Sequence, residues 1–565
     1  MQQQINQWRA HLPDEARREL EGLTPEELND RFYRKLEFGT AGMRGVIGMG
    51  TNRMNIYTVM QATAGVADTI LQSGTAEAGV VISYDSRRMS EEFARVTAEV
   101  LAAAGVKAYL FDAIHPVPML SFAIRHLRAA AGVMITASHN PAQYNGYKVY
   151  GADGAQLEPE RAAKTVAAID RHGYFDVPRM PLDEAIRAGL VIMIGGEVDE
   201  AYYQTVEKLA ICPADVRALP DFKIVYTPLH GAGNIPVRTM LTRMGVQKLI
   251  LVEEQLAPDP DFSTVQVPNP EVRETFTLAM EKARQEDAEE IIATDPDADR
   301  MGLAVRDNNG EFVILSGNQI GCLLLYHILS AKTEAGTLPE NGAVVKTIVS
   351  TELATAIAES FKVKIFDVLT GFKFIGEKIR SFEQTGSHTF LFGFEESYGY
   401  LAGTYARDKD AVAASMLITE MAAHYARQGK TLYEALEEIY ARYGYYLENT
   451  SSVSLEGAEG MTKMKEIMQR IRTRLPREIG GKKVELTRDF ASLTATDAAG
   501  VSTPIEGFPV SDCLHFRLEG GAWACIRPSG TEPKIKVYAA GRGADKTEAQ
   551  AVLDAVKADM RGLLK

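Results

Sequence analysis

The sequence has few cysteines and no long hydrophobic segment, and both shortages limit what the chain can be. Its 565 residues include four cysteines, none in the Cys-x-x-Cys spacing of zinc or redox sites. Only Cys513 and Cys525 lie near each other in sequence, so we expect a reduced, cytoplasmic setting rather than a disulfide-stabilised fold. The most apolar stretch, Cys322 to Leu329, is far shorter than the roughly 20 residues that span a membrane. We therefore expect no contact with a bilayer. The four cysteines are Cys212, Cys322, Cys513 and Cys525.

The chain also lacks a net positive charge and several common motifs. The net charge of −14 argues against a nucleic-acid-binding protein, which needs a dense face of lysine and arginine. The polar start, Met1 to Ala10, has no apolar core of a secretory signal. No P-loop and no Gly-x-Gly-x-x-Gly motif occurs, so a nucleotide site is not supported.

What the sequence does contain is enough apolar material for several packed domains. Hydrophobic residues make up 46% of the chain and charged residues 24%, which is typical of a globular protein. A domain usually holds about 100 to 200 residues, so three or four domains are expected.

Three stretches share one pattern of apolar strand, turn, helix and second apolar strand. They start at Val80, Phe222 and Ala343. Strands joined by a helical crossover pair in parallel, so we predict three related α/β domains with mixed sheets in series around a cleft. One large doubly wound sheet is the alternative. The pattern changes near Asn449, where a helix at Met461–Leu475 and a strand-rich tail predict a smaller C-terminal α+β domain. The predicted domains are residues 1–200, 201–320, 321–448 and 449–565.

Each repeat is followed by a further apolar run that ends in a polar loop. These runs are AGVMIT before Ala137, EEIIAT before Asp295 and HTFLFG before Phe394. In open α/β sheets, ligands bind beyond the carboxyl ends of the strands. We therefore expect the three loops to face one cleft.

The second of these loops carries three aspartates, Asp295, Asp297 and Asp299. Pro296 biases Asp295 away from helix, and in an extended segment alternate residues share one face. Three carboxylates on one face repel one another unless a cation neutralises them, and oxygen ligands suit Mg²⁺ or Mn²⁺. A solvated acidic turn is the alternative.

The first loop carries Ser138, with His139, Asn140 and Lys148 close in sequence. A serine hydroxyl is a poor nucleophile, so it needs a neighbouring base or a phosphoryl group that is already attached. No Gly-x-Ser-x-Gly motif surrounds it, which weakens a hydrolase interpretation. An ordinary Asn-Pro turn is the alternative.

Two further segments have the chemistry to bind a sugar phosphate. Glu395, Glu396 and Ser397 offer acceptors and a hydroxyl for sugar hydroxyls, although a surface loop would look the same. The tail offers a guanidinium, two hydroxyls and a flexible backbone that could wrap an anion, although a simple β-turn is as consistent. The residues of this phosphate loop are Arg527, Ser529, Gly530 and Thr531.

Taken together, the motifs TASHNP, DPDADR, GFEES and RPSGTEP resemble the four signatures of the α-D-phosphohexomutase superfamily. They occur in the family's order over nearly the whole chain. The sugar loop and the AGMRG start are most similar to the bacterial α-phosphoglucomutase branch, which also resembles phosphopentomutases.

The resemblance implies a role for each motif. Ser138 would carry the transferable phosphate, and the three aspartates with that phosphoserine would hold Mg²⁺. Lys148 and Arg44 match catalytic positions close to the serine. The expected substrate contacts are Glu395, Ser397, His139, Arg300, Thr370, Gly371, Lys409, Arg527, Ser529, Gly530 and Thr531.

The implied activity interconverts glucose 1-phosphate and glucose 6-phosphate, with glucose 1,6-bisphosphate as intermediate and activator, in a monomer or weak homodimer. One departure matters: the phosphomannomutase branch has a histidine after the sugar-loop serine and glycine, where this chain has Tyr400. The acid/base group there is left open. The rival interpretations are a phosphopentomutase, a phosphomannomutase, a non-catalytic sugar-phosphate-binding protein, and a serine hydrolase or metal phosphatase.

Overall fold

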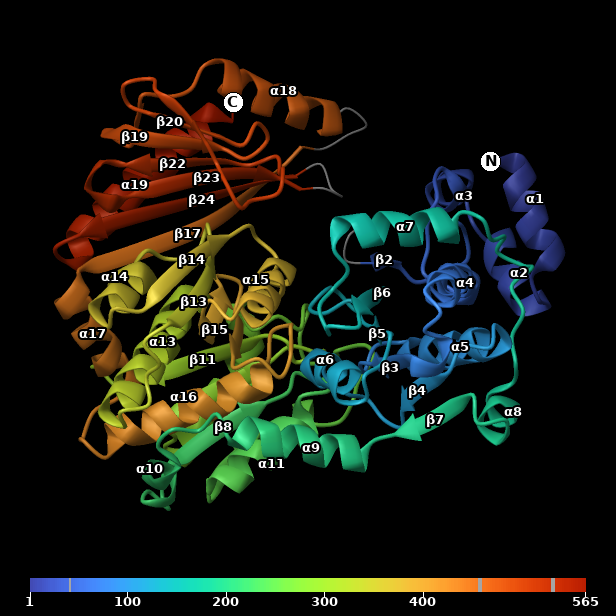
Figure 1. Ribbon diagram of the computed structural model, residues 1–565, viewed down its shortest axis with the longest axis horizontal. Coiled ribbons are helices and arrows are strands. Elements are labelled where there is room, and N and C mark those ends of the chain that lie inside the picture. The colour runs from blue at the N-terminus through green and yellow to red at the C-terminus, as the bar shows by residue number, and fades with distance from the viewer. Residues whose placement is uncertain (40–41, 456–459, 530–533, 565) are drawn as a thin grey trace.

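The strands of this protein form four sheets in a computed structural model that describes residues 1–39, 42–455, 460–529 and 534–564 (Figure 1). Three sheets are mixed and carry helical crossovers, and the fourth is antiparallel along its main path. The prediction of three α/β units followed by an α+β unit is confirmed. The alternative of one doubly wound sheet is wrong.

The first sheet has seven strands in the order β1-β2-β6-β5-β3-β4-β7. The strands β3, β4, β5 and β7 are parallel, and β6 runs antiparallel to β5. The strands are β1 (Phe38–Gly39), β2 (Gly42–Val46), β3 (Val80–Tyr84), β4 (Ala108–Phe111), β5 (Ala131–Ile135), β6 (Tyr144–Gly151) and β7 (Val191–Ile194). The helices are α1 (Gln2–His11), α2 (Asp14–Glu21), α3 (Pro25–Phe32), α4 (Ile56–Gln72), α5 (Ser90–Ala103), α6 (Val117–His126), α7 (Pro159–Ile169) and α8 (Leu182–Arg187).

The second sheet has five strands in the order β12-β11-β10-β8-β9, and the third has four in the order β14-β13-β15-β16. The second contains β8 (Lys223–Thr227), β9 (Lys248–Leu251), β10 (Glu290–Thr294), β11 (Met301–Arg306) and β12 (Phe312–Ile314). The third contains β13 (Gly342–Thr347), β14 (Lys364–Val368), β15 (Thr389–Glu395) and β16 (Gly399–Ala402). Their helices are α9 (Gly196–Glu207), α10 (Pro213–Arg217), α11 (Asn234–Met244), α12 (Thr277–Glu286), α13 (Gly317–Glu334), α14 (Leu353–Ser360), α15 (Phe372–Thr385), α16 (Ala411–Ala426) and α17 (Leu432–Tyr443).

The three mixed sheets share one core topology. Three parallel strands are followed by a fourth that pairs antiparallel with the third, in the orders β4-β3-β5-β6, β9-β8-β10-β11 and β14-β13-β15-β16. The loop between the third and fourth strands is therefore a tight connection at the carboxyl end of a central strand. In each sheet, this connection is the polar loop that the sequence singled out.

The fourth sheet forms the C-terminal unit, and α18 and α19 pack against its strand β24. Its strands are β17 (Tyr445–Ser454), β18 (Glu478–Ile479), β19 (Lys482–Asp489), β20 (Thr494–Asp497), β21 (Ser502–Pro504), β22 (Leu514–Leu518), β23 (Trp523–Pro528) and β24 (Lys534–Gly543). The helices are α18 (Gly460–Thr473), which confirms the predicted helix, and α19 (Lys546–Leu563).

Hydrophobic packing joins the units into one body. The largest cluster of buried side chains includes Phe122 of α6, Tyr202 of α9, Leu323 of α13 and Leu417 of α16, so it joins the first three units. A separate cluster packs Ile348, Val349 and Leu369 of the third unit against Phe490, Trp523 and Tyr538 of the fourth. Burial of this kind fixes the four units relative to one another.

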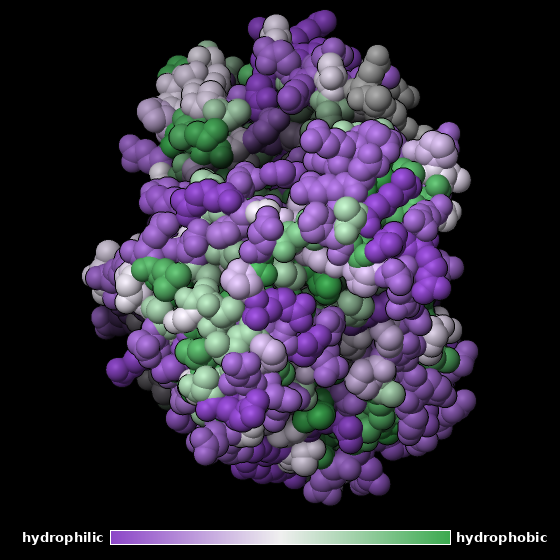
Figure 2. All heavy atoms as spheres, turned by 90° about the vertical axis from the view of Figure 1, so that its right-hand side faces the viewer, coloured by the Kyte–Doolittle hydropathy of each residue, from purple (hydrophilic) through white to green (hydrophobic). Residues whose placement is uncertain are grey.

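The surface is mixed in character. The face that carries the N-terminal helices is mostly hydrophilic, with small separate hydrophobic areas (Figure 2). Across the described residues, no helix combines the length and the apolar character that crossing a membrane requires.

Candidate functional site

The Ser138 loop joins β5 to β6 and presents its hydroxyl to the second unit. Ser138 adopts a positive φ of 52° and is 3% exposed. Its N–H donates to Thr136 Oγ1 at 2.8 Å, and its Oγ donates to Asp295 Oδ2 at 2.9 Å. The serine hydroxyl and the aspartate loop therefore meet across a boundary between two sheets.

A buried arginine that sequence reasoning missed holds the backbone of this loop. The Arg87 side chain is fully buried, and its guanidinium donates to the carbonyl oxygens of Ser138, Asn140 and Tyr144. Asp85, which directly follows β3, forms an ion pair with it at 3.3 Å. The sequence signal for this support is Asp85, an acid at the carboxyl end of a parallel strand.

The aspartate loop is a turn, which corrects the extended geometry expected from its alternating residues. Ala298 has a φ of 45°, and the loop lies between the antiparallel strands β10 and β11. Its backbone is held from two sides, because Val117 N donates to the carbonyl oxygen of Asp297 and Ala411 N to that of Ala298. The three carboxylates thus converge because the chain turns, and because the first and third units clamp the turn.

The three carboxylates form a compact buried cluster. One ligand atom from each lies within 4.8 Å of the others, and each residue is at most 2% exposed. Asp295 Oδ1 accepts hydrogen bonds from the N–H groups of Asp299 and Arg300. Asp297 Oδ1 and Asp299 Oδ1 have no hydrogen-bond partner among the described residues. Buried acceptors without partners are costly, and a cation would satisfy them.

Two buried lysines balance part of this negative charge. Lys148 Nζ of β6 lies 2.9 Å from Asp297 Oδ2, and Lys409 Nζ lies 3.0 Å from Asp299 Oδ2. Burial opposes ionisation of Asp297, yet Lys148 holds the pKa of that carboxyl below its usual range. Burial and the neighbouring carboxylates raise the pKa of Asp295 and of Asp299. The cluster therefore still lacks positive charge.

The donor set fits a divalent cation. Three carboxylates and the Ser138 oxygen are hard oxygen ligands, which Mg²⁺ prefers, and Mg²⁺ commonly adds waters and phosphate oxygens to a few protein ligands. The two orphaned aspartate oxygens are the observation that supports this fit. Two other residues of the loop remain outside the set, since Pro296 has no ligand side chain and Arg300 is a cation.

The sugar loop follows β15 in the third unit. Glu395 is 7% exposed, and its Oε1 accepts the Gly371 N–H at 2.8 Å. This contact brings Thr370 and Gly371 beside the loop. Burial raises the pKa of Glu395, and the cations Lys409 and Arg300 partly offset that effect. Ser397 is partly exposed beside it.

The two tyrosines of this loop, Tyr398 and Tyr400, are not placed to act as the acid/base group. Tyr398 OH donates to the carbonyl oxygen of Leu315, and Tyr400 OH to that of Gly317. Burial raises the pKa of both tyrosines. Because both hydroxyls are engaged with backbone in the interior, neither offers a proton to a sugar, and the acid/base group must lie elsewhere.

The phosphate loop is described in part, because Gly530 and Thr531 lie outside the described residues. Arg527 of β23 pairs directly with Lys536 of β24, so two cations stand side by side on one face of the sheet. Like charges in that position destabilise a sheet unless an anion lies between them. Burial and the charge of Arg527 lower the pKa of Lys536, and Glu396 partly offsets them. The fourth unit therefore presents positive charge to the sugar loop.

The remaining predicted residues lie beside Ser138. Arg44 of β2 donates to Asn140 Oδ1 at 2.9 Å. His139 Nδ1 lies 3.2 Å from Ser138 Oγ, and burial together with Arg300 and Arg44 holds the pKa of the imidazole well below its usual range. A neutral imidazole next to the serine is able to accept a proton. The structure thus brings residues from all four units toward one site.

Family comparisons agree with this arrangement. Four profiles described as "Phosphoglucomutase/phosphomannomutase" match the chain in order. The α/β/α domains I, II and III match residues 35–174, 200–310 and 316–443, and the C-terminal domain matches residues 472–558.

Curated relatives and a solved structure give the same picture. A phosphoglucomutase of Staphylococcus haemolyticus is 39% identical over 508 residues, covering 90% of each chain. A phosphoglucomutase of Staphylococcus epidermidis is 40% identical over 517 residues, covering 91% of this chain and 92% of its own. A Thermus thermophilus structure described as a phosphomannomutase has a TM-score of 0.68 at 24% identity, covering 94% of this chain and 99% of its own, which shows the shared fold.

Proposed function

The chain belongs to the phosphoglucomutase/phosphomannomutase family, and we propose that it interconverts glucose 1-phosphate and glucose 6-phosphate. The observation that carries the proposal is the 2.9 Å hydrogen bond from Ser138 Oγ to Asp295 Oδ2. It joins the loop that carries the candidate nucleophile to the loop that carries the proposed metal ligands. The curated relatives named phosphoglucomutase support glucose phosphates as substrates.

In this proposal Ser138 stores a phosphoryl group between turnovers. The free hydroxyl of a glucose monophosphate attacks the phosphorus, the bond to Ser138 Oγ breaks, and the hydroxyl proton passes to a base. The product is glucose 1,6-bisphosphate, which reverses its orientation in the site. Its other phosphoryl group then returns to Ser138 Oγ and releases the isomeric monophosphate. The protein contributes mainly position and charge to such transfers.

The residues around the serine divide this work. Arg87 fixes the backbone from which Ser138 projects, and Lys148 and Lys409 hold Asp297 and Asp299 as ligands. Asp295, Asp297, Asp299 and Ser138 would bind Mg²⁺. When bound, the ion would offset the charge that develops on the phosphoryl oxygens.

The sugar is held at its other end. Glu395 and Ser397 are placed to bind sugar hydroxyls, while Arg527 and Lys536 supply positive charge for the phosphate that does not react. Since the bisphosphate must present either phosphate to Ser138, this distal contact has to accept both orientations. The adjacent cations Arg527 and Lys536 can bind the distal phosphate in either orientation, because they contact the phosphate and not the sugar hydroxyls.

We propose a cytoplasmic enzyme, supported by four free cysteines. We propose a monomer or weak homodimer, which light scattering on the purified protein tests. We propose domain boundaries at residues 200, 320 and 448, which fall within α9 (Gly196–Glu207), α13 (Gly317–Glu334) and β17 (Tyr445–Ser454).

A comparative assay tests the activity. Purified protein with Mg²⁺ and catalytic glucose 1,6-bisphosphate should convert glucose 1-phosphate to glucose 6-phosphate. We expect kcat/KM for ribose 1-phosphate and mannose 1-phosphate to be lower by at least about tenfold, a difference of about 1.4 kcal/mol in transition-state binding. A preference for the pentose or the mannose phosphate would replace the substrate assignment. Sustained release of inorganic phosphate would indicate a phosphatase instead.

A further inference from the structure

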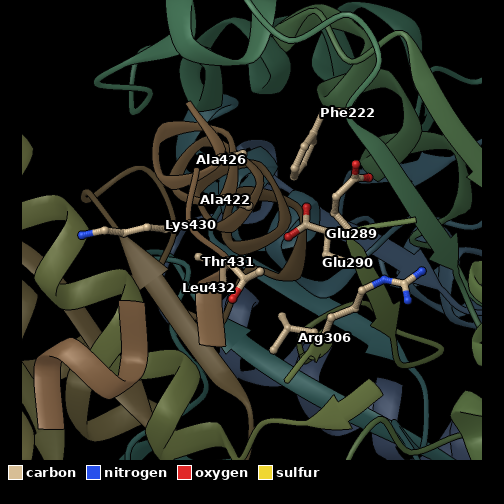
Figure 3. A pocket seen from close by; sticks show the side chains of 10 residues that line it. Phe222, Glu289, Glu290, Arg306, Ala422, Ala426, Lys430, Thr431 and Leu432 are labelled. Atoms are coloured by element: carbon tan, nitrogen blue, oxygen red, sulfur yellow. The ribbon is translucent and has the colours of Figure 1, made fainter. Parts of the chain in front are cut away.

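A pocket outside the proposed active site lies between the second and third units. It has a cavity volume of about 80 Å³ and is lined by the start of β10, the end of β11, α16 and the loop into α17 (Figure 3). This is smaller than the roughly 300 to 1,000 Å³ of pockets for drug-sized ligands, so the site suits only a compact ligand. Its lining residues are Phe222, Glu289, Glu290, Val305, Arg306, Ala422, Ala426, Lys430, Thr431 and Leu432.

One acidic side chain in this pocket has an unused oxygen. Glu290 is 1% exposed, and its Oε1 accepts a hydrogen bond from Thr419 Oγ1 at 3.2 Å. Its Oε2 has no hydrogen-bond partner within the described part of the chain. Burial raises the pKa of this carboxyl to about 8. A buried acid left half-satisfied costs free energy, which a bound donor would recover.

The other charged residues of the pocket are already paired and point outward. Arg306 Nη2 binds Asp287 at 2.9 Å, and Lys430 Nζ binds Glu438 at 2.5 Å. Figure 3 shows the Arg306 and Lys430 side chains extending to opposite sides of the pocket. Neither cation therefore neutralises Glu290.

The neighbouring acid is paired as well. Glu289 Oε2 accepts the backbone N–H of Lys223 at 2.7 Å. The remaining walls are mostly apolar. They are formed by Phe222, Val305, Ala422, Ala426 and Leu432.

We propose that this pocket binds a small organic amine, with its ammonium group on Glu290 Oε2 and its apolar body against Phe222 and Leu432. A protonated amine supplies the missing donor and the missing positive charge in one group. A compact aromatic or aliphatic body suits the apolar walls. A neutral ligand would satisfy only the hydrogen bond, and an anion would be repelled.

The pocket is separate from the proposed catalytic centre. Glu290 begins β10, and Asp295 follows the last residue of that strand. At about 3.3 Å per residue, the two lie roughly 17 Å apart along the strand. Binding here does not depend on the proposed mutase activity, so the two proposals can fail independently.

Ligand-observed fluorine NMR on the full-length protein tests the proposal. The probes are 4-fluorobenzylamine and its neutral counterpart 4-fluorobenzyl alcohol, titrated near pH 8, the pKa of Glu290. We expect millimolar binding of the amine and at least about tenfold weaker binding of the alcohol, since a charge-assisted hydrogen bond is lost. Saturating glucose 6-phosphate should not displace the amine.

Matched variants test whether the Glu290 carboxyl itself, and not a neighbouring residue, binds the amine. Glu290→Gln should weaken amine binding by at least about tenfold, whereas Glu289→Gln should change it less than about twofold. Ala426→Phe, which adds bulk to the pocket wall and leaves Glu290 in place, should abolish binding and guards against a Glu290 variant that does not fold. Equal binding of amine and alcohol, an unaffected Glu290→Gln variant, or no amine binding to the folded wild type would each overturn the proposal.

Discussion

Ser138, Ala298 and Tyr398 each adopt a positive φ, and each lies in one of the three loops that meet at the site. Left-handed backbone is unfavourable for residues with a side chain, by about 1 kcal/mol or more. Hydrogen bonds from neighbouring segments hold these conformations. The Arg87 contacts and the bonds from Val117 and Ala411 are examples.

This backbone explains what the sequence could and could not reveal at the residue scale. The acidic triplet and the serine were recognisable because their residue types and spacing are unusual. The turn between Asp297 and Asp299 was not, because its left-handed residue is an alanine and no glycine marks the place. Arg87 was missed because its role depends on backbone carbonyls, which leave no trace in a motif.

Asp297→Asn tests the metal site. The change removes the negative charge of a carboxylate whose Oδ1 has no hydrogen-bond partner among the described residues. We expect Mg²⁺ affinity to fall by at least about tenfold and kcat by about 100-fold. A Mg²⁺ titration of the rate measures both. Asp287→Asn is the control, because Asp287 is exposed and already has a positive φ that asparagine adopts well. An unchanged Mg²⁺ titration in Asp297→Asn would count against the site.

Arg87→Lys tests the support of the Ser138 loop. A lysine keeps the charge beside Asp85 but cannot reach several carbonyl oxygens at once, so the serine should lose its fixed position. We expect kcat to fall about 10- to 100-fold with little change in Mg²⁺ affinity. Steady-state kinetics and a Mg²⁺ titration check this. Arg88→Lys, an exposed neighbour paired with Asp261, should behave like wild type, and a matching result for Arg87→Lys would refute the role.

At the scale of elements, one connection recurs three times. In each mixed sheet the chain leaves a buried central strand, makes a short polar loop and returns antiparallel. The apolar runs before the loops predicted the central strands, because a short run that ends in polar residues is typical of a buried strand. Their place at the carboxyl ends of those strands also predicted that the three loops face one cleft. The individual contacts between the loops could not be predicted, since packing between units decides them.

The start of helix α15 requires a glycine at position 371, and this requirement can be tested. Gly371 precedes α15 at a φ of 115°, where its N–H reaches Glu395, and Gly386 ends the same helix at a φ of 63°. Gly371→Ala should shift that N–H and raise KM for glucose 1-phosphate by about tenfold, because Glu395 loses its positioning contact. Gly386→Ala should lower stability by about 1 kcal/mol without changing KM. Steady-state kinetics and thermal melting separate the two, and equal KM values would refute the role of Gly371.

At the scale of the whole molecule, an acidic protein gathers cations at one place. The net charge is −14, yet Arg44, Lys148, Lys409 and Arg527 come from three of the four units to surround the candidate site. The net charge argued against nucleic acid as a partner, but composition could not locate this positive region. Its assembly depends on the buried contacts between units, including the cluster that joins Val349 to Trp523.

The most direct test of the account follows one phosphoryl group through the site. The enzyme is labelled at phosphorus with glucose 1,6-bisphosphate, freed of small molecules and mixed with unlabelled glucose 1-phosphate and Mg²⁺. We predict that the label leaves the protein and is recovered in glucose 1,6-bisphosphate, and that folded Ser138→Ala takes up no label. Label on the Ser138→Ala protein, or recovery of the label as inorganic phosphate, would contradict the account.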